Sequence, residues 1–198
     1  MESPTLKIYT VLSELENENE LLQDENEKEI RERLIEQIIG KAIEYDAHVF
    51  KYRYDEYVKE LISRGIEFVA MEKTSIATQW DVLFASSVTE AEKKNTEHYN
   101  DQYKWHLFSF ELLQAAKKSE AKQKFNLQKK DTLYMFFQLS DEAFLLKNAH
   151  LLKASDFDIL SEFTTMDNAD MYIFDPLGKW TYIITHEATC GPYFYCTK

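Results

Sequence analysis

The sequence contains little glycine and proline. Four glycines and three prolines occur in 198 residues, whereas these two residue types together make up about 12% of an average protein. Long disordered or low-complexity stretches are rich in these residues, so the sequence predicts long elements joined by few loops. Walker-type loops, G-x-G-x-x-G loops and G-x-S-x-G elbows do not occur. Enzymes built on such motifs are therefore excluded.

Cysteine is equally scarce, because Cys190 and Cys196 are the only two. Their spacing of six fits neither a zinc knuckle nor a redox CxxC pair. We interpret both as free thiols of a protein in a reducing compartment.

Positive charge is in short supply. The sequence has 23 Lys and Arg residues and 35 Asp and Glu residues, which gives a net charge of −12. This charge repels phosphate backbones and anionic lipids, so we expect neither nucleic acid nor membrane as a partner. No apolar run approaches the roughly 18 residues of a membrane span, and the N-terminus lacks the pattern of a signal peptide. The sequence predicts a cytoplasmic protein and points to no cofactor.

The N-terminal part combines an acidic run with a long helical pattern. Residues 5–12 (TLKIYTVL) are predicted to form a short strand, and the acidic run SELENENELLQDENEKE follows. Asp24 or Asn26 can cap the next helix. Its apolar stripe at three- and four-residue spacing consists of Ile30, Leu34, Ile35, Ile38, Ile39, Ala42 and Ile43. We expect the stripe to be buried against the rest of the protein or a second copy, so Ile38→Asp should cost several kcal/mol.

The middle of the chain alternates helical and strand patterns. The helical pattern continues to Gly65, which occupies the position of a left-handed C-terminal cap. Residues 66–72 (IEFVAME) then read as a strand. Ser75 or Thr78 is expected to cap a following helix that carries apolar residues. Further along, TEAE fits an S/T-x-x-E capping box.

Strand-like runs dominate the second half. Three of them are residues 103–110 (YKWHLFSF), 132–138 (TLYMFFQ) and 143–149 (AFLLKNA), and residues 111–126 between them favour a helix. The turns LSDE and DPLG predict antiparallel hairpins. The predicted fold class is α+β, with an antiparallel β-sheet in the C-terminal half, one face of it covered by helices, and a helical N-terminal segment. We divide the chain into an acidic, helical extension (1–55) and an α+β domain (56–198).

Several motifs occur in a fixed order along this α+β domain. They are FASSVTEAEKK, YKWHLFSFE, FFQLSDEAFLLKNA, MYIFDPLGKWTYIITHE and CGPYFY. On these motifs the chain resembles, from about residue 58 to 196, a small family of uncharacterised proteins of Bacillus and related bacteria. The resemblance implies no activity and no catalytic residues, because the family has none established. Residues 1 to about 55 look like an addition to the family's shorter form.

The group His186, Glu187 and Cys190 looks most like a catalytic site. It is similar to H-E-x-x-H, which binds zinc only because a helical turn aligns its two histidines. The β-branched residues before His186 indicate a strand instead. We predict that residues 179–185 pair with 171–175 and that the strand ends at His186-Glu187, where the histidine bonds to a carboxylate or carbonyl. A zinc site completed by His106 or His150 is the alternative.

A second candidate is Trp105-His106, with Ser109 as a nucleophile. Alternation along a strand would place His106 and Ser109 on opposite faces, so we disfavour this pair. The carboxylates in SDEAF, ASDFD and TMDNAD are interpreted as loops and caps rather than metal ligands.

Aromatic residues crowd the C-terminal strands. Most should be core, but an edge strand could present some to a partner. The candidate binding residues are Trp105, His106, Trp180, Tyr182, His186, Glu187, Tyr193 and Tyr195.

Three functions are compatible with these features. The first is a non-enzymatic protein-binding module, of the immunity or inhibitor type, whose carboxylates (for example Glu14, Glu16, Glu18 and Glu20) attract a basic toxin or enzyme. The second is a metal-dependent or hydrolytic enzyme centred on His186, Glu187 and His106. The third is a structural homo-oligomer formed through the helix at residues 30–43.

Overall fold

The computed structural model describes residues 5–95, 103–163, 170–187 and 189–197. The chain divides into two compact units, Met1–Asp55 and Glu56–Lys198. The helices are α1 (Leu6–Glu20), α2 (Glu25–Ser63), α3 (Lys73–Trp80), the π-helix η1 (Asp81–Ala85), α4 (Glu90–Asn95), α5 (His106–Ser109), α6 (Lys118–Leu127), the 3-10 helix η2 (Ala149–Leu151) and α7 (Ala154–Glu162). The strands are β1 (Glu67–Ala70), β2 (Ala116–Lys117), β3 (Thr132–Phe137), β4 (Ala143–Lys147), β5 (Met171–Asp175), β6 (Trp180–Ile184) and β7 (Tyr193–Cys196). The α+β prediction is confirmed.

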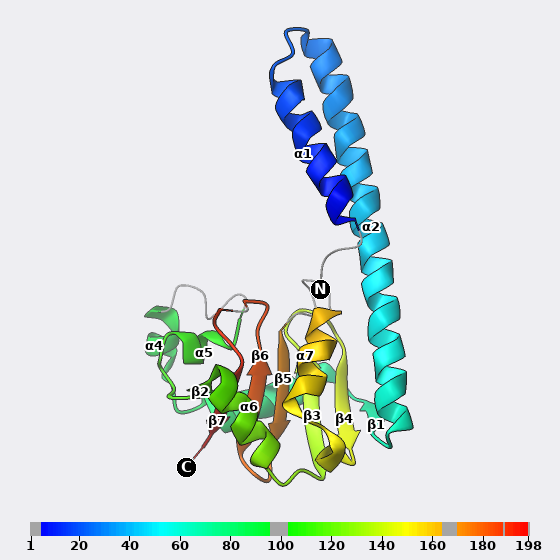
Figure 1. The fold of residues 1–198 in the computed structure, drawn as a ribbon. Coiled ribbons are helices and arrows are strands. Elements are labelled where there is room, and N and C mark those ends of the chain that lie inside the picture. Colours follow the sequence, from blue (N-terminus) through cyan, green and yellow to red (C-terminus); the bar gives the residue numbers. More distant parts are fainter. Residues whose placement is uncertain (1–4, 96–102, 164–169, 188, 198) are drawn as a thin grey trace. The chain divides into compact units, whose positions relative to one another are not determined.

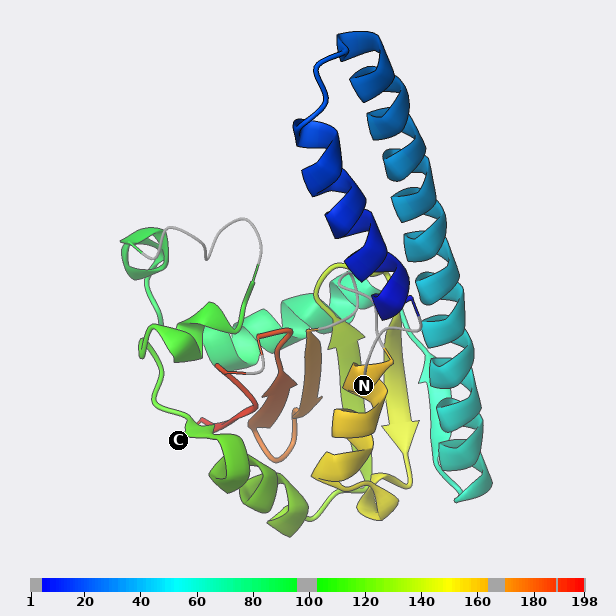
Figure 2. The ribbon, with the colours of Figure 1, turned by 45° about the horizontal axis from the view of Figure 1, so that its top comes forward.

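The first unit is a helical hairpin in which α1 runs antiparallel to the first part of α2 (Figures 1 and 2). The Thr5 hydroxyl donates to Asp46 Oδ2 at 2.6 Å, and Asn19 Nδ2 donates to the Lys28 carbonyl at 3.3 Å. The prediction of a strand at residues 5–12 is wrong. The buried residues Thr5, Leu12 and Asn19 recur at helical spacing, and this period outweighs the local preference for a strand.

The apolar stripe of α2 is only partly buried within one chain. Ile35 and Ala42 face the hairpin interior, whereas Ile30, Leu34, Ile38 and Ile43 are 46–60% exposed. The stripe is wider than α1 can cover, because it spans more than a third of the helix circumference. Burial of the whole stripe within the chain is therefore not found.

The second unit contains a seven-stranded antiparallel sheet in the order β1-β4-β3-β5-β6-β7-β2. Both predicted hairpins are confirmed. Phe136 of β3 faces Ala143 of β4, and Asp175 of β5 faces Trp180 of β6 across the DPLG turn. Two short strands, β1 and β2, form the edges of the sheet.

Helices cover both faces of the sheet, not one as predicted. Helices α6 and α7 lie on one face and α3 with η1 on the other (Figures 1 and 2). The central strands explain this arrangement, because β6 is buried at all five positions and β5 at four of five. Alternate residues of such strands point to opposite faces, so apolar side chains on both faces need a cover.

The core is correspondingly divided into two layers. Trp80 and Phe108 pack with Tyr172 on the α3 face, and the Trp80 indole N–H donates to Thr181 Oγ1 at 2.9 Å. Phe125 of α6 packs on Tyr182 on the opposite face, at a centroid distance of 4.7 Å. These two layers hold the β5–β6 hairpin from both sides.

Residues 103–110 are not a strand. Trp105 lies in a turn, and residues 106–109 form the single-turn helix α5. A short apolar run has no clear period, so a strand and a buried helical turn look alike in sequence. The helix predicted at 111–126 begins only at Lys118, after the edge strand β2.

The predicted helix ends had mixed outcomes. Gly65 has φ of +100° as expected, and the Glu92 carboxylate accepts from Thr89 N at 2.8 Å in the predicted capping box. Asp24 caps α2 through the backbone N–H of Asn26 at 2.9 Å. The cap of α3 is Glu72, which accepts from two backbone N–H groups, and not Ser75 or Thr78.

Among the described residues, no helix combines the length and apolar character that a bilayer crossing requires.

Candidate functional site

His186 lies just beyond the end of β6, as predicted, with Thr185 between them, and it contacts a residue that the sequence did not single out. Its backbone N–H donates to Asp170 Oδ1 at 2.7 Å, and its Nδ1 lies 2.9 Å from the same oxygen. The second carboxylate oxygen of Asp170 accepts from Trp105 Nε1 at 3.2 Å. Asp170 is 3% exposed, so these donors replace its hydration. The result is an aspartate–histidine pair with a fixed imidazole orientation.

The register of the sheet could have revealed this pair. Asp170 immediately precedes β5, and Met171 of β5 faces Ile184 of β6. In an antiparallel hairpin the residues just beyond this pair, at 170 and 185–186, must lie side by side. Asp170 belongs to the segment TMDNAD, which we interpreted as a loop; the other residues of that segment lie outside the described part of the chain.

A second histidine borders the pair through aromatic rings. The centroid of the Trp105 ring lies 4.1 Å from that of His106 and 5.8 Å from that of His186. The Tyr103 ring packs against both imidazoles. His106 Nδ1 is 3.1 Å from Ser109 Oγ. The prediction that His106 and Ser109 point apart is wrong, because one helical turn brings them together. The serine and the aspartate nevertheless contact different histidines, which is not the relay of a hydrolase triad.

Glu187 and Cys190 pair with each other rather than with His186. Cys190 Sγ donates to Glu187 Oε2 at 3.0 Å, and this hydrogen bond, with some burial, raises the pKa of the thiol. A thiol that donates a proton to a carboxylate is a poor nucleophile and a poor metal ligand. Within the described residues, no three His, Cys, Asp or Glu side chains are placed to hold a metal ion.

The aromatic candidates on the C-terminal strands lie mainly in the core. Trp105, Trp180, Tyr182 and Tyr193 are at most 2% exposed, and Tyr195 is half-buried. Burial raises the pKa of Tyr193 to about 12. In this conformation these four side chains cannot reach a partner, so an exposed binding surface has to be sought elsewhere.

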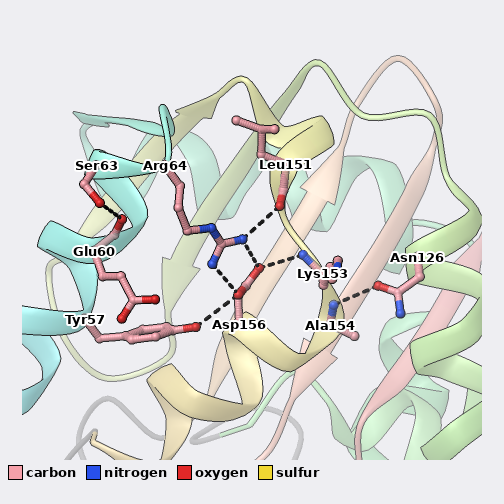
Figure 3. A network of polar contacts seen from close by, with 9 residues as sticks. All are labelled: Tyr57, Glu60, Ser63, Arg64, Asn126, Leu151, Lys153, Ala154 and Asp156. Atoms are coloured by element: carbon pink, nitrogen blue, oxygen red, sulfur yellow. Dashed lines mark hydrogen bonds and ion pairs between the residues drawn. The ribbon is translucent and has the colours of Figure 1, made fainter.

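A polar network that the sequence did not predict joins the end of α2 to the start of α7 (Figure 3). Arg64 donates to Asp156 through both terminal nitrogens, at 2.8 and 3.2 Å, and to the Leu151 carbonyl at 3.0 Å. The Tyr57 hydroxyl donates to Asp156 Oδ1 at 3.0 Å, and Lys153 N donates to Oδ2 at 2.8 Å. The segment ASDFD, interpreted as a loop or cap, lies in α7, where Lys153 is the N-cap and the Asp156 carboxylate accepts from its backbone N–H in a capping box.

The electrostatics of this network are those of a structural contact. Burial acts to raise the pKa of Asp156, but the hydrogen bonds from Arg64, Lys153 and Tyr57 outweigh it and hold this pKa below its usual range. Burial, followed by the bond to Asp156, raises the pKa of Tyr57 to about 12. Since each carboxylate oxygen of Asp156 accepts two hydrogen bonds from within the protein, the network fastens α7 to α2 and leaves this carboxylate little capacity for a ligand.

Comparison with known families identifies the second unit. The profile of the family described as Domain of unknown function (DUF4275) matches residues 55–194. The chain belongs to the DUF4275 family. Comparison with curated proteins and with solved structures gives no match. The DUF4275 match covers the sheet up to the first half of β7, the Asp170–His186 pair and the Arg64 network, and it leaves out the α1–α2 hairpin.

The hairpin that precedes the DUF4275 match has one acidic face. A cavity of about 350 Å³ lies between α1 and α2, and its lining includes Glu16 and Glu20 of α1 and Glu32 and Glu36 of α2. We call these four residues the acidic face. The buried Asn19 also lines the cavity, and its side-chain oxygen has no hydrogen-bond partner in the described part of the chain. The lining is therefore rich in hydrogen-bond acceptors.

The opposite face of the hairpin is apolar. About 3.6 residues per turn place Leu34 and Ile38 on one flank of the buried Ile35, and Glu32 and Glu36 on the other. The same spacing on α1 separates an apolar flank from Glu16 and Glu20. Because the glutamates of both helices line one cavity, the two apolar flanks share the other face. We call this the apolar face: Ile8, Val11, Leu15, Ile30, Leu34, Ile38 and Tyr45, which are 38–60% exposed.

Proposed function

We propose that this DUF4275 protein is a non-enzymatic, cytoplasmic protein-binding module that recognises a basic partner through the acidic face of its hairpin. An inhibitor or immunity protein that neutralises a basic toxin or enzyme is the kind of protein that fits. The observation that carries the proposal is the cavity between α1 and α2, with its four carboxylates.

The charge distribution supports the proposal. Residues 1–55 contain seven Lys and Arg against 14 Asp and Glu, a net charge of −7 out of the −12 of the whole chain. More than half of the excess charge thus lies in little more than a quarter of the sequence. Concentrated charge of one sign accelerates the encounter with an oppositely charged protein.

The placement of the carboxylates favours a protein surface over a single ion. They are distributed over two turns of each helix, and no three-ligand metal cluster occurs in the described ranges. Lys and Arg side chains from a partner can each meet a different glutamate, and Arg can do so with two hydrogen bonds.

The test uses a charge-reversal variant and a charge-matched control. Glu20→Lys/Glu36→Lys changes the acidic face, and Asp131→Lys/Glu162→Lys makes the same charge change at exposed positions of the second unit. Proteins captured from the native host by the wild type are identified, purified and measured for association and dissociation rates across a salt series. We expect a basic partner that the control variant retains and the acidic-face variant loses.

The salt series adds a second criterion. The Debye length falls from about 10 Å at 0.1 M to about 3 Å at 1 M, so the association rate should fall steeply and the dissociation rate much less. Equal loss with both variants, an acidic partner or a salt-independent association rate would contradict the proposal.

A second candidate function is acid–base catalysis by His186. The specific observation in its favour is the buried Asp170 that orients the imidazole, an arrangement also used to position catalytic histidines. Turnover of a small-molecule ester or amide that is lost in His186→Ala and kept in Glu20→Lys/Glu36→Lys would favour this enzyme over the binding module.

A further inference from the structure

The apolar face is an unusual surface for one chain to expose. Seven aliphatic or aromatic side chains, each 38–60% exposed, lie along one side of two adjacent helices, whereas scattered single residues are the norm on protein surfaces. In the hairpin interior, Leu12, Ile35 and Ala42 are the buried apolar residues between α1 and this part of α2. Two helices with so small a shared core gain little stability from each other alone.

We propose that a second copy of this chain covers the apolar face, so that two hairpins form an antiparallel four-helix bundle. This inference goes beyond the proposed function, because it concerns the face opposite the acidic one. Pairing of two-helix hairpins through apolar flanks is the standard way to complete such a core, with helix axes about 8–10 Å apart.

The charges along the border of the apolar face favour a second copy over a basic partner. Helical spacing places Lys7, Glu14 and Glu18 beside the α1 part of the face, and Glu27, Arg31 and Lys41 in line with Leu34 and Ile38 on α2. Arg31 pairs with Glu27 at 2.9 Å, and Lys41 pairs with Glu44 at 2.6 Å. With Glu44 included, four carboxylates stand against three cations, so the charges along the border nearly cancel although the hairpin as a whole is acidic. A basic protein would gain little net attraction here, and an identical copy would meet little net repulsion.

The positions of two border charges favour the antiparallel arrangement. Lys7 lies at the start of α1 and Glu18 near its end. If the hairpins run antiparallel, α1 lies over the α1 of the second copy, and Glu18 of each copy faces Lys7 of the other. A parallel arrangement would place α1 of one copy over α2 of the other at the same level. Lys7 of one copy would then lie near Lys41 of the other, and the two positive charges would repel each other.

The excess negative charge does not oppose this dimer. Each acidic face points away from the other copy, so the two acidic faces are separated by two helix layers, roughly 20 Å. That separation exceeds twice the Debye length of about 8 Å at physiological ionic strength, so their repulsion is largely screened.

The first test is the molar mass of the full chain in solution, by sedimentation or light scattering. We expect a dimer for the wild type and a monomer for Ile38→Asp, which places a charge at the centre of the apolar face. Ile43→Asp is the matched control. Ile43 is also an exposed isoleucine of α2, 56% exposed against 46% for Ile38, but it lies toward the acidic face. It should remain dimeric. A monomeric wild type, or an equal effect of both variants, would overturn the proposal; unchanged helical circular dichroism establishes that Ile38→Asp is folded.

The second test concerns orientation. Lys7→Glu and Glu18→Lys should each raise the dimer dissociation constant about tenfold, and the double variant should recover most of the loss, because the pair is restored with its signs exchanged. Failure of the double variant to recover would exclude the antiparallel bundle. The monomeric Ile38→Asp chain should still bind the basic partner through the acidic face, so dimerisation and partner binding can fail independently.

Discussion

At the scale of single residues, Tyr182 carries a polar group that the core does not satisfy. Its ring is fully buried against Phe125, its hydroxyl has no hydrogen-bond partner among the described residues, and burial raises its pKa. A desolvated hydroxyl without a partner costs free energy. We expect Tyr182→Phe to increase the free energy of unfolding by up to about 1 kcal/mol in urea denaturation.

Tyr172→Phe is the control for this prediction. The Tyr172 hydroxyl accepts a hydrogen bond from Trp105 N at 3.1 Å, so its removal leaves a buried N–H unpaired. We expect the free energy of unfolding of Tyr172→Phe to fall by about 1–2 kcal/mol. A comparable loss in Tyr182→Phe would mean that its hydroxyl does have a partner, such as a buried water.

Arg64 and Asp156 provide a pH-dependent prediction at the same scale. The pKa of Asp156 is lower in the folded than in the unfolded protein, so its stabilising contribution is complete above the unfolded value near 4 and is lost as pH falls through the folded value. Arg64→Ala leaves a buried carboxylate without its cation. It should cost about 2 kcal/mol at pH 7, less than for a fully buried pair because the Arg64 side chain is 34% exposed.

The measurement is the free energy of unfolding of wild type and Arg64→Ala from pH 7 down to pH 3. The difference between them should shrink as Asp156 becomes protonated. Lys59→Ala, which breaks the exposed pair with Glu56, should change stability by less than about 0.5 kcal/mol at every pH. A difference for Arg64→Ala that does not depend on pH would assign its effect to lost packing instead.

At the scale of elements, the C-terminal end of α6 depends on a lysine. Lys130 is 3% exposed, donates to the carbonyls of Phe125 and Gln128 at 3.0 and 3.3 Å, and has its pKa lowered by burial. Lys130→Met keeps the stem but leaves these carbonyls without the donor, and should cost about 1–3 kcal/mol. The neighbouring, exposed Lys129→Met is the control and should be neutral in thermal unfolding. Increased stability of Lys130→Met would show that the cost of burying the ammonium group dominates.

Elements with a strong local pattern could be predicted from the sequence. The β5–β6 hairpin follows from alternation on both sides of Asp175–Gly178, and the strand ends before His186 as predicted. Residues 5–12 and 103–110 were misread because a few β-branched or aromatic residues fit a strand and a helix equally well. The partner of His186 was missed for a different reason: Asp170 lies 16 positions away, and only the pairing of strands brings it near.

At the scale of the whole molecule, the two proposed interactions should respond differently to salt. Partner binding uses an uncompensated acidic face, whereas dimerisation uses an apolar face with a nearly balanced border. Raising NaCl from 0.05 to 0.5 M should weaken partner binding at least tenfold and change the dimer dissociation constant less than about threefold. The two constants can be measured on the same preparation. A dimer that dissociates steeply with salt would show that charge, not apolar contact, holds it together.

The edges of the sheet limit how far assembly can go. The edge strand β2 has two residues, and the other edge, β1, has four and carries Glu67 paired with Lys147 at 2.9 Å. A neighbouring molecule finds no long unpaired ladder on which to add a strand. The proposed pairing through the hairpin uses the same face on both copies and leaves none for a third. Neither the edges of the described sheet nor the proposed dimer offers a starting point for filaments, so we expect concentrated solutions to contain closed pairs rather than open-ended polymers.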